Sequence, residues 1–352
     1  MAGDINPFCL SSFLAFRYVI DPAAEWLPGI CPAWPDTSDQ GGIPVETVQE
    51  IETHLNAIVT SRLTPATGIL LSGGIDSAIL AAFLPPGTRA YTIKFNAEAF
   101  LDESVQARVY ADTLGLNHSV VEIDWEDYAI FAPQLMRHKK APLHAIEVAL
   151  HKAALTAHTD GIDTLVVGNG ADSTFGGMDK LLSRDWTLAE FYRRYTFVDP
   201  FLALRDPVDL HAVYEPYLRP NGLIDTQAFL KTVHGIGIIQ SFECAIHAAG
   251  LALLEPFESL RYTRPLDLTR IRSGDSKYLL KDLFRRQFAG MEPPEKIPFA
   301  RPMDIWLNDW PGPARPEFKA DTDWSVFSGD QRWLLYSLEQ FLDQLDAGGL
   351  DG

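Results

Sequence analysis

Short apolar runs alternate with longer amphipathic segments between residues 45 and 184. From Val45 to Leu63, apolar residues recur at helical spacing, which predicts a helix. The alternation that follows predicts strands over 67–72, 89–95, 118–123 and 164–168, and helices over 76–84, 103–114, 125–137 and 143–158. Strands separated by helices of about ten or more residues form parallel sheets. The pattern therefore predicts the α/β class, with a parallel sheet flanked by helices on both faces.

The two ends of the chain have different patterns. Residues 1–44 carry aromatic residues and prolines with little periodicity, which predicts an extended arm that packs on another surface. Beyond about residue 184 the strand signals fade and helical patterns dominate. The helices predicted there cover 187–195, 225–234, 236–252, 275–289 and 330–346. We therefore divide the chain into an arm (1–44), a sheet-bearing domain (45–184) and a mostly helical part (185–352) that covers the sheet.

Two glycine-bearing turns follow predicted strands. One is the Ser-Gly-Gly turn at 72–74, and the other is the Gly-Asn-Gly turn at 168–170. Glycines let the backbone turn sharply, and the amide groups of such a turn, nearby serine hydroxyls and the start of a helix together favour a phosphate group. The first turn lacks the Gly-Lys-Ser/Thr ending of a P-loop, and no G-x-G-x-x-G dinucleotide fingerprint is present.

An aspartate lies just after each turn. Asp76 would repel a bare phosphate, so its place beside an anion cradle predicts a cation between them. Mg²⁺ is the cation that commonly bridges carboxylate and phosphate oxygens. Ligands of parallel sheets bind at the carboxyl ends of the strands, where Asp172 would meet Asp76. The alternative interpretation of Asp76 is a helix N-cap. Two aspartates at two strand ends favour a single metal–phosphate site.

Composition narrows the set of partners and compartments. The chain has 352 residues and a formal net charge of −18, which argues against general binding to nucleic acids because like charges repel. Cys9, Cys31 and Cys244 show no paired spacing, so neither a disulfide framework nor a structural zinc site is expected. The sequence has no apolar run of membrane-spanning length and no signal-peptide pattern. We therefore expect a cytoplasmic protein.

Several motifs resemble the synthetase domain of the asparagine synthetase superfamily, whose members are ATP pyrophosphatases with an adenine nucleotide alpha hydrolase-like fold. S-G-G-I-D-S at 72–77 resembles their pyrophosphate loop. G-N-G-A-D-S-T-F-G-G-M at 168–178 resembles a second signature, and its Gly-Gly-Met ending is similar to that of β-lactam synthetases. Further similar stretches, in the same order along the chain, are SSFLAFRYV (11–19), LDESVQARVYADTLGLNH (101–118), KYLLKDLF (277–284) and EKIPFARPMDIWL (295–307).

The resemblance implies an AMP-forming amide ligase that uses ATP and Mg²⁺. In such enzymes ATP adenylates a substrate carboxylate, pyrophosphate leaves, and ammonia or an amine displaces AMP. Residues 45–184 would form the nucleotide-binding domain. Asp76 and Asp172 are implied to bind the metal, and Lys296 to stabilise both transition states. The implied nucleotide-binding residues are Leu70, Ser72, Gly73, Gly74, Asp76, Ser77, Ile93, Lys94, Phe95, Gly168, Asn169, Gly170, Lys277 and Lys296. For Lys277 and for Lys296, a solvated surface charge is the alternative.

Departures from the family pattern change the expected chemistry. Ala2 stands where glutamine-dependent members have a nucleophilic cysteine, so we expect no glutaminase activity. The nitrogen would then come from free ammonia, an amine or a separate amidotransferase subunit. Asn169 stands where the family has Glu or Tyr, and an amide is not a general base. Glu243 and His247 are the candidates to replace it. Differences at 173–174 and 251–260 leave the carboxylate substrate open.

Other functions stay open at this stage. One is an intramolecular cyclase similar to β-lactam synthetases, and another is a non-catalytic relative that binds nucleotide and regulates a partner. A tRNA- or sulfur-modifying pyrophosphatase needs a basic face or reactive cysteines, and the charge and the cysteine spacing disfavour it. The apolar residues of the arm indicate a covered surface. It could contact an ammonia-supplying subunit or a second copy of the chain in a homodimer, or it could simply be part of the hydrophobic core.

Overall fold

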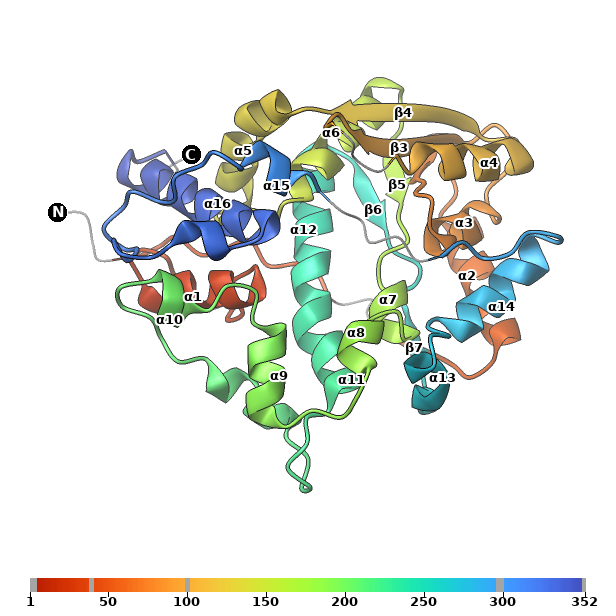
Figure 1. The fold of residues 1–352 in the computed structure, drawn as a ribbon. Coiled ribbons are helices and arrows are strands. Elements are labelled where there is room, and N and C mark those ends of the chain that lie inside the picture. Colours follow the sequence, from red (N-terminus) through yellow and green to blue (C-terminus); the bar gives the residue numbers. More distant parts are fainter. Residues whose placement is uncertain (1–4, 38–40, 99–101, 296–300, 350–352) are drawn as a thin grey trace.

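The predicted parallel sheet is present in the structure, a computed structural model that describes residues 5–37, 41–98, 102–295 and 301–349. Within these residues its five strands lie in the order β4-β3-β2-β5-β6, and every neighbouring pair is parallel (Figure 1). They are β2 (Thr67–Leu70), β3 (Arg89–Phe95), β4 (Asn117–Ile123), β5 (Thr164–Val166) and β6 (Ala252–Leu254). Because all the strands run in one direction, their carboxyl ends share one edge of the sheet. The predicted fold class is confirmed.

Each face of the sheet has its own hydrophobic core, because successive side chains of a strand point to opposite faces. Leu165 and Val167 belong to one core, whereas Val166 belongs to the other. The first core is shared with α5 (Trp125–Lys139), α6 (Glu147–Thr159) and α12 (Gly235–His247). The second is shared with α2 (Val48–Ser61), α3 (Ile75–Ala81), α4 (Ser104–Leu114) and α14 (Tyr278–Gln287). In Figure 1, α12 and α14 lie on opposite sides of the strands.

The N-terminal segment contains a helix, α1 (Pro7–Phe16), where the sequence pattern predicts an extended arm, so that prediction is wrong. Asn6 caps the helix by accepting a hydrogen bond from the amide of Phe8 at 3.0 Å. All residues from Cys9 to Phe16 are buried, so the helix has no polar face that would reveal a helical period. The helix packs against α16 (Gly329–Asp346), and Trp26 beyond it meets the ring of Phe341 with centroids 4.9 Å apart.

The helical part contains two strands that the sequence pattern does not predict. The helix predicted over 236–252 ends at His247, and residues 252–254 form β6, the edge strand of the main sheet. β7 (Leu260–Tyr262) pairs in parallel with β1 (Ile43–Val45) in a second, two-stranded sheet. A strand of three residues is too short to show the alternation by which strands are recognised. As a consequence, the segment after β6 lies at the same sheet edge as the two glycine-bearing turns.

The remaining predicted helices are present with shifted ends. The segments 187–195 and 330–346 correspond to α9 (Leu188–Tyr195) and α16. The segment 225–234 consists of α11 (Thr226–Phe229) and a π-helical turn, η3 (Leu230–His234), that continues into α12. π-Helical turns are rare and frequent at functional sites. Short helices complete the fold: α7 (Ala171–Thr174), α8 (Asp179–Leu182), α10 (Pro200–Ala203), α13 (Leu268–Arg272), α15 (Met303–Trp306) and the 3₁₀ turns η1 (His211–Val213), η2 (Glu215–Tyr217) and η4 (Trp324–Val326).

Cys9, Cys31 and Cys244 are free thiols, as the cysteine spacing predicts. Burial raises the pKa of Cys9 and of Cys244 to about 12, so both thiols stay protonated and poorly nucleophilic at neutral pH. In the part of the chain that the structure describes, no helix is both long and apolar enough to cross a bilayer.

Candidate active site

A cavity of about 510 Å³ lies at the carboxyl edge of the sheet and is lined by residues from three strands or the turns that follow them. The turns after β2 and β5 form one side of it, and α12 forms another. The predicted site residues that line it are Leu70, Ser72, Asp76, Ser77, Ile93, Gly168, Asn169, Gly170 and Asp172. Its volume falls in the range of small-molecule sites, about 300–1,000 Å³. The parallel sheet thus brings together residues that lie far apart in the sequence.

One wall of the cavity is apolar and offers a surface for a heterocyclic base. Leu70 and Ile93 belong to this wall, as predicted, together with Leu71, Ile146, Leu150 and Val167. Two residues predicted beside Ile93 are not among the described lining residues. Lys94 Nζ pairs with Asp102 Oδ2 at 3.2 Å, and the ring of Phe95 packs edge-on against Trp306.

The Ser-Gly-Gly turn is held in place by its two serines. The amide of Ser72 donates to Ser77 Oγ at 2.9 Å, and the two hydroxyl oxygens lie 3.0 Å apart. The amide of Gly74 donates to Ser72 Oγ at 3.2 Å. Gly168, at the end of the neighbouring strand, comes so close that a Cβ there would lie 3.0 Å from the amide nitrogen of Ser77. The two signature turns are therefore in direct contact, and a side chain at 168 would push the backbone of the neighbouring turn away by a few tenths of an ångström.

Asp76 and Asp172 converge on one cation, the ammonium group of Lys277. Lys277 Nζ lies 2.9 Å from Asp172 Oδ1 and also contacts Asp76 Oδ2. The lysine side chain is only 8% exposed. Burial by itself would lower the pKa of Lys277, but the charges of the two aspartates outweigh it and raise the pKa above its usual value. The alternative prediction for Lys277, a solvated surface charge, is wrong.

The carboxylate pair also fits a divalent metal. Mg²⁺ prefers oxygen ligands and is commonly held by one or two carboxylates together with substrate phosphates. Among the described residues no cluster of three or more His, Cys, Asp or Glu side chains forms a metal site on protein ligands alone. Asp76 and Asp172, already placed around a positive charge, are therefore the residues that would hold Mg²⁺ with a nucleotide.

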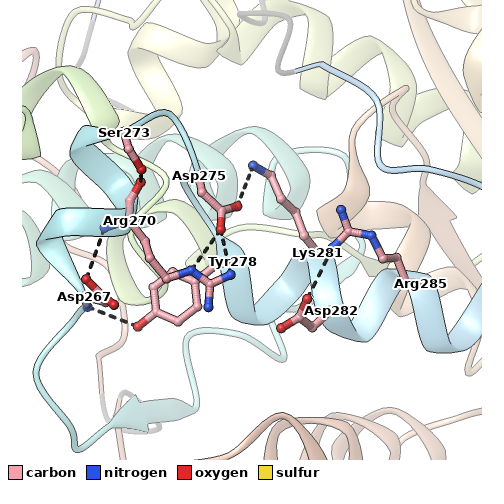
Figure 2. A network of polar contacts seen from close by, with 8 residues as sticks. All are labelled: Asp267, Arg270, Ser273, Asp275, Tyr278, Lys281, Asp282 and Arg285. Atoms are coloured by element: carbon pink, nitrogen blue, oxygen red, sulfur yellow. Dashed lines mark hydrogen bonds and ion pairs between the residues drawn. The ribbon is translucent and has the colours of Figure 1, made fainter.

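Lys277 is aimed at the aspartates by an unusual backbone conformation. It has a φ of 53°, in the left-handed region, and directly precedes α14. Figure 2 shows the polar network around this turn. Asp275 accepts two hydrogen bonds from Arg270 at 2.9 and 2.6 Å and one from Lys281 at 3.3 Å, so it joins α13 to α14 on both sides of Lys277. The guanidinium of Arg270 also lies over the ring of Tyr278 at 4.4 Å. This network fixes the strained turn.

Two glutamates that the sequence analysis did not select follow the end of β6. Asn169 Nδ2 donates a hydrogen bond to Glu255 Oε1 at 2.7 Å. Glu258 lines the cavity next to Gly170, where a Cβ would come within 2.9 Å of the glutamate amide nitrogen. Burial raises the pKa of Glu255 to about 8, although the bond from Asn169 opposes the change. Burial also raises the pKa of Glu258 to about 7, against the attraction of Lys231.

The bases proposed from the sequence do not reach the cavity. α12 presents Gly235, Ile238 and Phe242 to it, at the spacing of one helical face. Glu243 lies off this face and accepts a hydrogen bond from the amide of Asp36 at 3.1 Å. His247, the last residue of α12, is likewise absent from the described lining. Lys296, predicted to be catalytic, lies outside the described residues.

The comparisons with known proteins assign the chain to a family. The family model described as "Asparagine synthase" matches residues 50–228. The chain is 29% identical over 155 residues to "Amidase chyE" of Penicillium rubens, covering 38% of this chain and 23% of that protein. It is 30% identical over 130 residues to "Amidase chry2" of Gibberella zeae, covering 32% of this chain and 19% of that protein. The matched region thus spans about a fifth of the length of these relatives.

Two solved structures were also similar at low levels. One is described as a predicted subunit of a tRNA methyltransferase from Methanocaldococcus jannaschii, with a TM-score of 0.25, 17% identity and coverage of 63% of this chain and 86% of that chain. The other is an NMN synthetase from Francisella tularensis, with a TM-score of 0.27, 14% identity and coverage of 72% and 97%. Scores this low do not assign the fold, which rests on the strand order above.

Proposed function

Because the chain belongs to the asparagine synthase family, we propose that it is an ATP-dependent, AMP-forming amide ligase. In the first step an oxygen of a substrate carboxylate attacks the α-phosphorus of ATP, and the bond to the β-phosphate oxygen breaks, giving an acyl-adenylate and pyrophosphate. In the second step ammonia or an amine attacks the acyl carbon, AMP leaves, and one proton is released. The first step makes the carboxylate reactive, because it turns a carboxylate oxygen into a good leaving group.

The observation that carries this proposal is that Asp76 and Asp172, which both line the nucleotide-sized cavity, converge on one positive charge. Two carboxylates beside an anion-binding turn repel a phosphate group unless a cation lies between the carboxylates and the phosphate. Held by these carboxylates and by phosphate oxygens, Mg²⁺ would neutralise charge on the pyrophosphate as it leaves. Lys277 is a second positive group at the same point. The network of Figure 2 links residues on both sides of it in the sequence.

The other residues of the edge have complementary roles in the proposal. The hydroxyls of Ser72 and Ser77 can turn from each other to the pyrophosphate, because a hydroxyl is both donor and acceptor. The apolar wall that includes Leu70 and Ile93 takes the adenine base. Together they orient ATP so that the α-phosphorus faces the part of the cavity lined by Gly170 and Glu258.

Glu258 is the proposed base of the second step. A neutral amine that attacks an acyl carbon becomes positively charged and must lose a proton. A carboxylate with a pKa of about 7 is matched to this task at neutral pH. Asn169 cannot accept that proton, and in this chain it instead donates a hydrogen bond to Glu255, three residues before Glu258 in the sequence. The exchange of the family residue at 169 is thus compatible with an active enzyme.

The experiment that tests the proposal measures AMP and pyrophosphate release from ATP and Mg²⁺ across a panel of small carboxylates, with and without ammonium. The proposal predicts equimolar AMP and pyrophosphate with at least one carboxylate, and an amide product when ammonium or an amine is added. Asp76→Asn and Asp172→Asn are expected to remove AMP release without unfolding the protein. ADP and phosphate as products contradict the proposal. ATP binding without any release across the panel favours a regulatory role, and turnover of an amine-bearing carboxylate without ammonium favours a cyclase.

A further inference from the structure

The ammonium group of Lys277 lies between the same two carboxylates that would hold a metal ion. Its Nζ is 2.9 Å from Asp172 Oδ1 and also contacts Asp76 Oδ2. Mg²⁺ holds its oxygen ligands at about 2.0–2.1 Å, so a metal ion bound to both carboxylates needs the space between them. An ammonium group and a metal ion cannot share that space. In the structure the two carboxylates therefore already have a cation, and it belongs to the chain itself.

Three separate segments of the chain bring these groups together. Asp76 lies in the first turn of α3, Asp172 lies in the first turn of α7, and Lys277 directly precedes α14. The helices α3 and α14 pack against each other. Gly177 leaves room for the lysine stem, since a Cβ at this position would overlap both Lys277 Cε and Asp172 Oδ1. The fold thus encloses the ammonium group closely beside both carboxylates.

The backbone of Lys277 is fixed on both sides. Asp275 binds Arg270 before it and Lys281 after it (Figure 2). The amide of Lys281 donates a hydrogen bond to the carbonyl oxygen of Lys277 at 2.9 Å. The side chain, in contrast, has a flexible four-carbon stem. Movement of the ammonium group away from the carboxylates therefore needs only rotations of the lysine side chain.

The balance of charge decides when the ammonium group moves away. Together, Asp76, Asp172 and Lys277 carry one net negative charge. Mg²⁺ on its own would have to displace the ammonium group, and two cations side by side repel each other. A nucleotide changes this balance, because its phosphate oxygens bind both Mg²⁺ and ammonium groups. With a nucleotide present, phosphate oxygens can replace the carboxylate oxygens as partners of Lys277.

We propose that Lys277 lies between Asp76 and Asp172 as long as no nucleotide is bound, so that these carboxylates take Mg²⁺ only together with ATP. Lys277 is then a positioning residue before the nucleotide binds, because two carboxylates repel each other without a cation between them. The inference rests on the proposed function for the identity of the nucleotide and the metal. It adds the order in which the two bind and the residue that sets this order.

The test measures metal binding itself, with Mn²⁺ as the probe. The full chain is dialysed to equilibrium against Mn²⁺, with and without a non-hydrolysable ATP analogue in both compartments, and the excess metal on the protein side is counted as bound. Lys277→Met removes the ammonium group. Lys180→Met, at an exposed position of α8, removes one positive charge elsewhere and is the matched control. Adding Asp76→Asn to each variant identifies the metal that binds at the aspartates.

Without nucleotide, we expect Lys277→Met to bind Mn²⁺ at the aspartates about 10- to 100-fold more tightly than wild type, the range of a charge-assisted hydrogen bond. The analogue should tighten Mn²⁺ binding to wild type, and by a smaller factor in Lys277→Met, which has no cation to displace. Melting curves give a second readout: Mn²⁺ alone should raise the melting temperature of Lys277→Met more than that of wild type. Lys180→Met should follow wild type in all three measurements.

Three results overturn the inference. Wild type binds Mn²⁺ at the aspartates as tightly without the analogue as with it, a comparison that needs no Lys277 variant. Without nucleotide, Lys277→Met binds Mn²⁺ no more tightly than wild type. Asp76→Asn leaves the Mn²⁺ binding of Lys277→Met unchanged.

The outcome for the proposed function is separate. If metal binding follows the expectation but no carboxylate yields AMP, the inference stands and the ligase proposal fails. If AMP forms while wild type and Lys277→Met bind Mn²⁺ equally without nucleotide, the ligase proposal stands and the inference fails.

Discussion

The side-chain amide of Asn169 donates a hydrogen bond to Glu255 Oε1 at 2.7 Å, and this bond joins the turn after β5 to the segment after β6. It connects Asn169, which stands where the family has a Glu or Tyr, to the segment that carries Glu258, the base proposed in its place. The residue at 169 is not a base, but it bonds Glu255 on the segment that also carries Glu258 into the cavity. The segment after β6 therefore adds two carboxyl groups, Glu255 and Glu258, to the sheet edge at which the turns after β2 and β5 carry Asp76 and Asp172.

The raised pKa of Glu255 has a consequence for stability. Its folded pKa of about 8 lies above the ordinary value of 4.5, so the folded state binds the proton more tightly. The stability from this group is fully present below about pH 4.5 and is lost as the pH rises through 8. Glu255→Gln keeps an acceptor for Asn169 and has no charge to bury. We therefore expect the melting temperature of the variant, measured relative to that of wild type, to be about 2–4 °C higher at pH 8.5 than at pH 5.5.

That figure corresponds to about 1 kcal/mol, discounted because Glu255 is not fully buried in the structure. Melting curves at both pH values provide the measurement. Glu215→Gln, at an exposed position, is the matched control and should melt in parallel with wild type. If the difference in melting temperature between Glu255→Gln and wild type is the same at both pH values, the Glu255 carboxyl titrates normally in the folded protein.

Glu258→Gln tests the proposed base of the second step. We expect it to lower the rate of amide formation by about 10²–10⁴-fold, the usual contribution of a general base. Exchange of pyrophosphate into ATP, which reports the first step, should fall far less. In wild type the rate of the second step should rise as the pH passes through about 7, because only the ionised carboxylate accepts a proton. Glu255→Gln retains the Glu258 carboxylate and should retain this rise; equal losses in both steps would assign Glu258 a structural role.

Gly177→Ala tests the contact between Asp172 and Lys277. A Cβ at this position would overlap both Asp172 Oδ1 and Lys277 Cε, so the pair must separate. We expect pyrophosphate exchange to fall by about 10²–10³-fold, the loss found when one preorganised electrostatic group is removed. The control is Gly42→Ala, which has open space around it and an ordinary φ. Full exchange activity in Gly177→Ala would mean that the pair is not needed for adenylation.

A buried ion pair supports the wall that carries His144. Lys139 Nζ lies 2.6 Å from Glu147 Oε1, both side chains are fully buried, and the same oxygen accepts a bond from the amide of His144 at 2.7 Å. Lys139→Met leaves Glu147 without its cation, which we expect to cost about 3–5 kcal/mol in the free energy of unfolding. Urea unfolding measures this loss. The double change Lys139→Met and Glu147→Leu should recover part of it, whereas a single variant as stable as wild type would contradict the prediction.

Much of the site could be predicted from the sequence because its parts follow strands with clear boundaries. The turns at 72–74 and 168–170 end apolar runs flanked by long helices, and parallel strands must present such turns at one edge. Asp76 and Asp172 were predicted to meet for this reason, and they share Lys277.

The rest of the site depends on contacts that no local pattern contains. β6 has three residues and begins at the last residue of the helix predicted over 236–252. The sequence pattern therefore predicted neither this strand nor a role for the glutamates that follow it. The run LLEP, an apolar stretch that ends in Glu-Pro, is the signal that could have indicated a strand end. α1 is buried from Cys9 to Phe16, so its sequence shows no helical period and Arg17 was not selected. Only the tertiary fold brings Arg17, from the N-terminal segment, to the wall of the cavity.

The most direct test of the central claim follows the oxygen atoms. A carboxylate substrate labelled with ¹⁸O in both oxygens is incubated with ATP, Mg²⁺ and the nitrogen donor, and the products are analysed by mass spectrometry. Adenylation at the edge formed by Asp76, Asp172 and Lys277 predicts one ¹⁸O atom in the AMP phosphate and none in pyrophosphate. Unlabelled AMP, or label in inorganic phosphate or pyrophosphate, would contradict an acyl-adenylate and with it the proposed use of the site.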